Sequence, residues 1–265
     1  MTEFRFDDPG SSFYQLLTSQ RPHLLPAFPE MLPSEKKDLS QMVPHGTTIL
    51  AIRYADGVVI AGDRRATEGY SISERRIEKV HNADAYSAVA IAGAAGPALE
   101  MTRLFRIELE HYEKLEGAEL SMDGKANKLA QMIKGNLPMA VQGLVVVPIF
   151  AGYDTRRGVG RIFKYDIAGG QYEEIEYYAV GSGGRDARGT LKKIYKKDLD
   201  RDGAVEAALE ALYDAAEADV ATGGPDLIRG IFPTIKVINA QGVSDIPDEQ
   251  IKELLEEMIH RQGGG

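Results

Sequence analysis

The amino-acid sequence changes character at residue 47, and this boundary constrains the fold more than any other feature. Residues 1–46 contain half of the chain's 12 prolines, and proline at this density blocks long helices and central strands. The same segment carries large apolar side chains, such as Phe4, Phe13 and Leu24, which favour burial against a surface. Two interpretations stay open: an extended arm packed on the domain, or a propeptide that is removed.

Regular structure is predicted only after this boundary. Apolar residues on both sides of Asp56-Gly57 predict a tight β-hairpin over 48–54 and 58–63. The other predicted elements alternate in blocks: strands at 79–81 and 86–92, helices at 97–109 and 126–144 with a kink at Pro138, strands at 145–153, 161–165 and 177–180, helices at 187–197 and 203–218, a strand pair at 231–239 and around 243, and a helix at 247–260. Blocks of strands followed by helices predict an α+β fold, a four-layer αββα sandwich of two antiparallel sheets flanked by helix pairs.

Composition narrows the classes of function. The formal net charge of −9 argues against a nucleic-acid-binding surface, which needs clustered Lys and Arg. The chain has no cysteine, which excludes disulfides and thiolate chemistry and fits a cytoplasmic location. The most apolar stretch, residues 143–152, is shorter than the roughly 20 residues of a membrane-spanning helix. The N-terminus lacks the layout of a secretion signal, so neither membrane insertion nor export is expected.

The junction His45-Gly46-Thr47-Thr48 is a candidate site of chemistry. A threonine hydroxyl is a poor nucleophile unless a base takes its proton. An N-terminal threonine carries its own base, because an α-amino group has a pKa of roughly 7.7–8. Thr47 would gain this base only by cleavage of the Gly46–Thr47 bond, and Gly46 suits such a cut because it lacks Cβ. The uncut chain is therefore predicted to be inactive.

Three further residues are candidates to assist Thr47. The hairpin brings Asp63 back beside the start of the first strand, and an ammonium from Lys79 between Asp63 and the hydroxyl would stabilise negative charge. The alternative for Asp63 and Lys79 is an ordinary surface salt bridge. Gly93 ends a strand with no side chain to block its backbone N–H, as an oxyanion donor requires, although a simple strand-to-helix turn explains it too.

Polar residues also stand in two turns of small residues. Ser182 lies in Gly181-Ser-Gly-Gly184, and Asp219 and Thr222 lie in Asp219-Val-Ala-Thr-Gly-Gly224. Such segments are commonly plain turns.

Taken together, the motifs resemble those of the proteasome β-subunit family. Their order and spacing match from Thr47 almost to the end of the chain, and two segments, 109–117 and 222–233, resemble the actinobacterial branch. The motifs are Gly46-Thr-Thr-Ile49, Ala61-Gly-Asp-Arg-Arg65, Lys79-Val80, Ile91-Ala-Gly93, Gly181-Ser-Gly183 and Asp219-Val-Ala-Thr-Gly-Gly224.

The resemblance implies a role for each matching position. It assigns the nucleophile of a threonine-type endopeptidase to Thr47, its supporting acid and base to Asp63 and Lys79, and its oxyanion donor to the Gly93 amide. The family's supporting Ser-Asp-Ser set falls on Ser182, Asp219 and Thr222, and here Thr222 departs from the serine of many relatives. The substrate pocket maps to residues that are small or apolar apart from one histidine: Ala66, Ile77, His81, Ile91 and Ala95. Thr67 is placed to hydrogen-bond the substrate backbone. Such a pocket favours cleavage after hydrophobic residues.

The resemblance also implies processing and assembly. Residues 1–46 would be a propeptide removed by autocatalysis between Gly46 and Thr47, and residues 47–265 the catalytic domain. The partners would be proteasome α subunits, other β subunits in stacked seven-membered rings (α7β7β7α7), an ATP-dependent unfoldase acting through the α ring, and polypeptide substrates. No cofactor and no metal ion are expected.

Two other functions remain to be weighed. One is a small-amide amidohydrolase with the same N-terminal nucleophile, which would need a clamp for a substrate carboxylate and no ring. The other is a non-catalytic structural subunit, which would have no use for Thr47, Asp63, Lys79 and Gly93 together.

Overall fold

The computed structural model describes residues 46–68 and 71–263. Two five-stranded antiparallel sheets form its centre. The first has the order β10 (Tyr177–Gly181), β1 (Thr48–Tyr54), β2 (Gly57–Gly62), β11 (Thr234–Asn239) and β12 (Gly242–Asp245). The second has the order β5 (Val80–Asp84), β6 (Ser87–Gly93), β7 (Val146–Asp154), β8 (Val159–Tyr165) and β9 (Gln171–Glu174).

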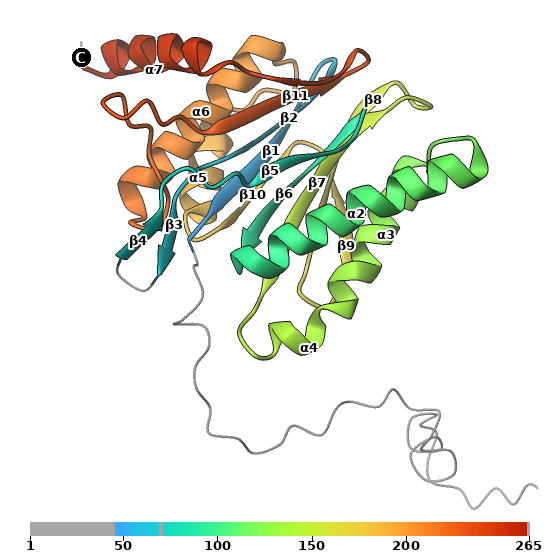
Figure 1. The fold of residues 1–265 in the computed structure, drawn as a ribbon. Helices are drawn as coiled ribbons and strands as arrows, with labels where there is room; N and C mark the ends of the chain where they lie inside the picture. Colours follow the sequence, from blue (N-terminus) through green and yellow to red (C-terminus); the bar gives the residue numbers. More distant parts are fainter. Residues whose placement is uncertain (1–45, 69–70, 264–265) are drawn as a thin grey trace, which may run out of the picture. The chain divides into compact units, whose positions relative to one another are not determined.

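Helices cover the outer face of each sheet (Figure 1). On the first sheet lie α5 (Gly184–Ile194) and α6 (Arg201–Ala218), and α7 (Asp248–Gly263) packs against α6. On the second sheet lie α2 (Ala95–Glu116) and α3 (Met122–Gly135), and the short α4 (Leu137–Ala140) follows α3. This arrangement confirms the predicted four-layer αββα sandwich. No helix among the described residues combines the length and apolar character needed to cross a bilayer.

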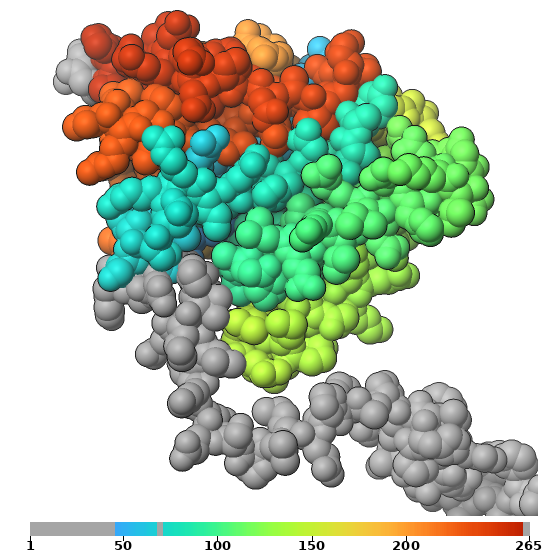
Figure 2. Space-filling model, in the orientation of Figure 1, coloured from blue at the N-terminus to red at the C-terminus, as the bar shows by residue number. Residues whose placement is uncertain are grey.

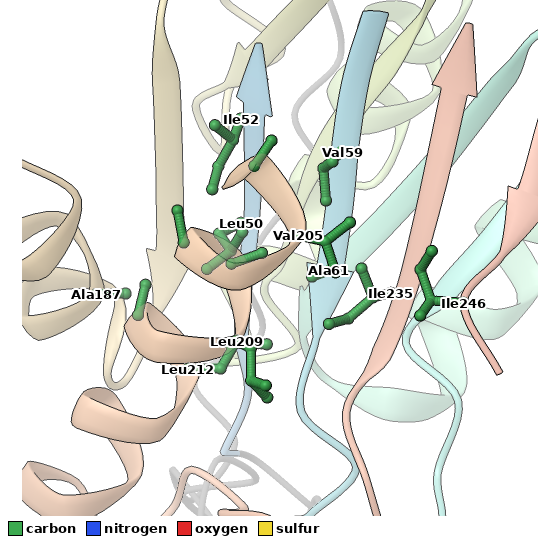
Figure 3. Close-up of a cluster of buried hydrophobic side chains, with 14 of the residues drawn as sticks. Leu50, Ile52, Val59, Ala61, Ala187, Val205, Leu209, Leu212, Ile235 and Ile246 are labelled. Carbon is green, nitrogen blue, oxygen red and sulfur yellow. The ribbon is translucent and has the colours of Figure 1, made fainter. Parts of the chain in front are cut away.

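Three clusters of buried side chains hold the layers together. Alternation along β1 sends Ile49 and Ala51 into the cluster between the two sheets, and Leu50 and Ile52 into the cluster under α5 and α6. Figure 3 shows the latter cluster, in which side chains of β1, β2 and β11 meet those of α5 and α6. The third cluster lies between the second sheet and α2 and α3. Since β1 is buried on both faces, its position is tightly fixed, and so is that of Thr47, which precedes it.

Local sequence explains the helix starts. The Ser121 side chain accepts a hydrogen bond from Gly124 N at the start of α3, and Asp200 accepts one from Gly203 N at the start of α6. Pro97 falls in the first turn of α2, where its missing N–H is tolerated.

The predicted elements differ from the structure at several points. A small hairpin of β3 (Ala66–Glu68) and β4 (Ser71–Glu74) was not predicted, nor was β9. The expected kink at Pro138 is instead a helix end, because α3 stops at Gly135 and Pro138 opens α4. Lys79 lies one residue before β5 rather than on the strand, and the last strand pair starts at Thr234 rather than at Ile231.

Candidate active site

The β1–β2 hairpin brings Thr47 and Asp63 together. Ile49 pairs with Gly62, so Asp63 emerges from β2 beside the start of β1. Two hydrogen bonds close this end: Asp63 N donates to Thr48 O at 3.1 Å, and Thr48 N donates to Asp63 Oδ1 at 2.7 Å. The other carboxylate oxygen, Oδ2, accepts from Arg65 N at 2.9 Å and Gly223 N at 2.8 Å. Asp63 is therefore held by three segments of backbone.

Lys79 forms a buried ion pair with Asp63. Its Nζ lies 2.7 Å from Asp63 Oδ1, and the two side chains are only 5% and 0% exposed, so the alternative of a surface salt bridge is wrong. Nζ also donates to Arg65 O at 2.5 Å and to Gly46 O at 3.0 Å, which satisfies all three of its N–H groups. Burial lowers the pKa of Lys79, and the charge of Asp63 opposes this only in part.

The Gly46–Thr47 peptide bond lies directly over this pair. Thr47 Oγ1 donates to Gly46 O at 2.6 Å, and Lys79 Nζ reaches the same oxygen. Gly46 has φ of 110°, a conformation that L residues rarely adopt. An added Cβ would lie 2.5 Å from Thr67 Oγ1 and 2.9 Å from the Ala221 Cβ, so only glycine fits at this position.

The two turns of small residues meet beside Thr47. Ser182 N donates to Thr47 O at 2.9 Å, and Thr47 N donates to Ser182 Oγ at 3.4 Å. Thr222 Oγ1 donates to Asp219 Oδ2 at 2.6 Å. Burial raises the pKa of Asp219, but hydrogen bonds from Ser182, Thr222 and backbone N–H groups outweigh it, so the pKa lies below its usual value. Asp219 is thus an ionised carboxylate beside Ser182.

Gly93 ends β6 next to Thr47 and lines a pocket that opens beside both residues. Its φ is 115°, and an added Cβ would lie 2.0 Å from Val145 O, so the backbone of β6 and that of the segment before β7 approach too closely for any side chain.

The pocket contains every lining residue proposed from the sequence and four that were missed. Ala66, Ile77, His81, Ile91 and Ala95 all line it, and Thr67 lies at Gly46 rather than on the pocket wall. Burial lowers the pKa of His81, which favours the neutral imidazole. Residues that were not expected are Glu78, Ala98, Leu99 and Thr102.

Helical spacing could have revealed most of the missed residues. Ala98, Leu99 and Thr102 follow Ala95 at i+3, i+4 and i+7, so they share one face of α2. In Figure 2 the segment containing β3, β4 and β5, coloured cyan to teal, lies against the beginning of α2, in green.

These features define a class of protein. A threonine ahead of the first strand of an αββα sandwich, beside a buried lysine–aspartate pair and a pocket, is the arrangement of N-terminal-nucleophile hydrolases. Residues 43–228 match the family described as Proteasome subunit. The chain therefore belongs to the proteasome subunit family, as its motifs indicated.

Relatives place it among the β subunits. The Proteasome subunit beta of Acidimicrobium ferrooxidans is 57% identical over 251 residues, which cover 95% of this chain and 90% of the relative. That of Frankia casuarinae is 52% identical, with 96% of this chain and 92% of the relative covered. That of Acidothermus cellulolyticus is also 52% identical, with 96% and 88% covered.

Proposed function

We propose that this chain is an N-terminal-threonine endopeptidase, made as a precursor in which residues 1–46 are a propeptide and residues 47–265 the catalytic domain. The observation that carries the proposal is the double hydrogen bond to Gly46 O, from the Lys79 ammonium and from the Thr47 hydroxyl. Cleavage of the Gly46–Thr47 bond needs a hydroxyl and a positive charge at this carbonyl group, and these two contacts support the proposal.

In the proposed self-cleavage, Thr47 Oγ attacks the carbonyl carbon of Gly46. Lys79 stabilises the negative charge that develops on the oxygen. The C–N bond then breaks, and the proton that Oγ gives up ends on the Thr47 nitrogen. Water hydrolyses the resulting ester, which releases Gly46 as a carboxylate and Thr47 with a free amino group. This sequence supplies the nucleophile and its base in one event.

In the processed chain, the new α-amino group takes the proton of Thr47 Oγ as it attacks a substrate carbonyl. The amine then passes the proton to the departing amine of the substrate, and water hydrolyses the acyl ester. The Gly93 amide is the proposed oxyanion donor, and Lys79 with Asp63 favours the negatively charged form of the nucleophile. Ser182, Asp219 and Thr222 are proposed to hold the amino group in position.

The substrate pocket supports a preference for hydrophobic residues on the acyl side of the cut. Its walls are mostly apolar or small, and the one carboxylate among its lining residues, Glu78, is exposed to solvent. Fluorogenic peptides ending in Leu, Tyr or Arg test this. We expect Leu and Tyr to be hydrolysed faster, and a preference for Arg would overturn the assignment.

We further propose that the chain assembles into the proteasome core particle with α subunits and with other β subunits, as stacked heptameric rings served by an ATP-dependent unfoldase. Family membership and the β-subunit relatives support this assembly. A buried ion pair that is costly to desolvate supports a catalytic subunit over a structural one.

Mass spectrometry of the chain co-expressed with its α subunit tests the central claim. We expect loss of residues 1–46 and no others, together with peptide hydrolysis by the assembled particle. A Thr47→Ala variant should stay uncut by its own site and be inactive. An intact chain that still hydrolyses peptides would overturn the prediction that the uncut chain is inactive. Processed particles that are inactive on polypeptides but active on small amides would favour the amidohydrolase.

A further inference from the structure

Thr48, the residue after the proposed nucleophile, has a fully buried side chain at the end of an apolar cluster. It is 0% exposed, and its neighbours on the same face of β1 are Leu50 and Ile52, which belong to the apolar cluster under α5 and α6. A hydroxyl at the end of such a cluster is costly unless it is hydrogen-bonded.

The Thr48 hydroxyl makes two hydrogen bonds that join separate parts of the chain. Thr48 Oγ1 accepts from Gly183 N at 3.0 Å, at the start of α5, and lies 2.7 Å from Thr222 Oγ1, in the loop after α6. Those two contacts span 135 and 174 residues of sequence. Thr48 thus ties both proposed supporting turns to the strand that carries Thr47.

Proton counting fixes the direction of these bonds. Thr222 has one hydroxyl proton, which it donates to Asp219 Oδ2 at 2.6 Å. At the Thr48–Thr222 contact, Thr48 must therefore be the donor. The result is an ordered chain from Gly183 N–H to the Thr48 hydroxyl, then to the Thr222 hydroxyl, and then to the Asp219 carboxylate.

The packing around this chain leaves little freedom to rearrange. A Cβ added at Gly183 would lie 2.6 Å from Thr222 Oγ1 and 2.7 Å from Thr48 Oγ1, so the two hydroxyls close directly over that glycine. Ser182, the residue before it, hydrogen-bonds both Thr47 and Asp219. A shift of Thr48 would therefore move Gly183 and, with it, Ser182, whose Oγ accepts from Thr47 N at 3.4 Å.

We infer that Thr48 is a positioning residue: its hydroxyl orders Thr222, Asp219 and the Ser182 turn around the nitrogen of Thr47. This inference rests on the proposed N-terminal-threonine function, in which that nitrogen becomes the base. Thr48 does not touch the reacting atoms. It acts through Thr222 and Gly183, on the side of β1 opposite to Thr47.

The test compares Thr48→Val, Thr48→Ser and wild type, each co-expressed with the α subunit. Valine keeps the shape but removes the hydroxyl, so we expect kcat for a fluorogenic peptide to fall about 10- to 100-fold with KM little changed, as misplaced catalytic groups produce. Self-cleavage should slow as well. Serine keeps the hydroxyl and should recover most of the activity.

Thr190→Val is the matched control. Thr190 is also a buried threonine, and its hydroxyl donates to Asp214 Oδ2 at 2.6 Å between α5 and α6, away from Thr47. Its loss should lower stability but leave kcat unchanged. If Thr48→Val does not assemble, Thr48→Ala replaces it, since alanine removes the hydroxyl without pressing a methyl group on Thr222.

The outcomes separate this inference from the proposed function. A normal kcat in Thr48→Val or Thr48→Ala, or a loss of kcat in Thr48→Ser as large as that in Thr48→Val, would overturn the positioning role. Activity of the wild type would still support Thr47 as the nucleophile in that case. An active Thr47→Ala variant would instead overturn the proposed function itself.

Discussion

Replacing Asp63 with asparagine removes one charge from the buried pair while nearly preserving its shape. The carboxylate accepts four hydrogen bonds: from Thr48 N and Lys79 Nζ on one oxygen, and from Arg65 N and Gly223 N on the other. Asparagine has one acceptor oxygen and one NH2 group, so either two backbone donors or the lysine and one backbone donor lose their acceptor.

The loss in stability follows from these contacts. Each unsatisfied buried donor costs about 1–3 kcal/mol, so two cost about 2–6 kcal/mol. Breaking a buried ion pair on one side costs about 3–5 kcal/mol. Because both figures describe the same contacts, they overlap, and we expect the free energy of unfolding to fall by about 3–5 kcal/mol.

Urea denaturation measures this change, with Thr47→Ala in every variant so that all chains stay uncut. The control is Glu110→Gln, the same chemical change in an exposed pair with Lys114, where no measurable effect is expected. A loss below about 1 kcal/mol for Asp63→Asn would refute the reasoning, because it would mean that Lys79 needs no buried counter-charge.

Two further predictions use other parts of the structure. Gly93→Ala should abolish peptide hydrolysis, because its φ of 115° and the nearby Val145 O leave no room for a Cβ atom. The control Gly96→Ala, in the open first turn of α2, should keep full activity in the same peptide assay. An active Gly93→Ala enzyme would contradict the assigned geometry. Hydrogen bonds from buried Arg161 lower the pKa values of Asp123 and Glu173, so these ion pairs stabilise the fold fully above the ordinary carboxyl pKa of about 4, and the stabilisation is lost as pH falls through the lower folded pKa values. Urea denaturation at a series of pH values should show that the free energy of unfolding falls less steeply with acid in Arg161→Met than in the wild type. An unchanged pH dependence would exclude this cluster as a cause of acid destabilisation.

The sequence predicted the parts of the site that depend on local pattern. Alternating apolar residues around Asp56-Gly57 predicted the first hairpin, and a hairpin necessarily returns Asp63 to the start of β1. The residues of β4 and β9 are exposed or half-buried and mostly polar, and β3 has only three residues, so these segments carry no apolar period that predicts a strand.

Other parts of the site depend on contacts between distant segments. Gly223 N meets Asp63 across 160 residues, and the Thr48 hydroxyl meets Thr222 across 174. Hydroxyl and amide groups leave no periodic trace in a sequence, because each can bond to almost any neighbour. The motif resemblance implied a role for Thr222 but none for Thr48, since only the folded chain shows that the two hydroxyls are joined.

The position of Lys79 before cleavage has a consequence for the processed chain. Two of its three N–H groups bond to Asp63 and Arg65 O, which belong to the domain, while the third bonds to Gly46 O, which leaves with the propeptide in the proposed reaction. Cleavage would therefore release one donor of a buried ammonium directly beside Thr47, without any movement of the other two contacts. A buried ammonium with a missing acceptor favours any negative charge that forms nearby. The same lysine that stabilises charge on Gly46 O during self-cleavage would thus be left preorganised to favour the alkoxide of Thr47 in each later turnover.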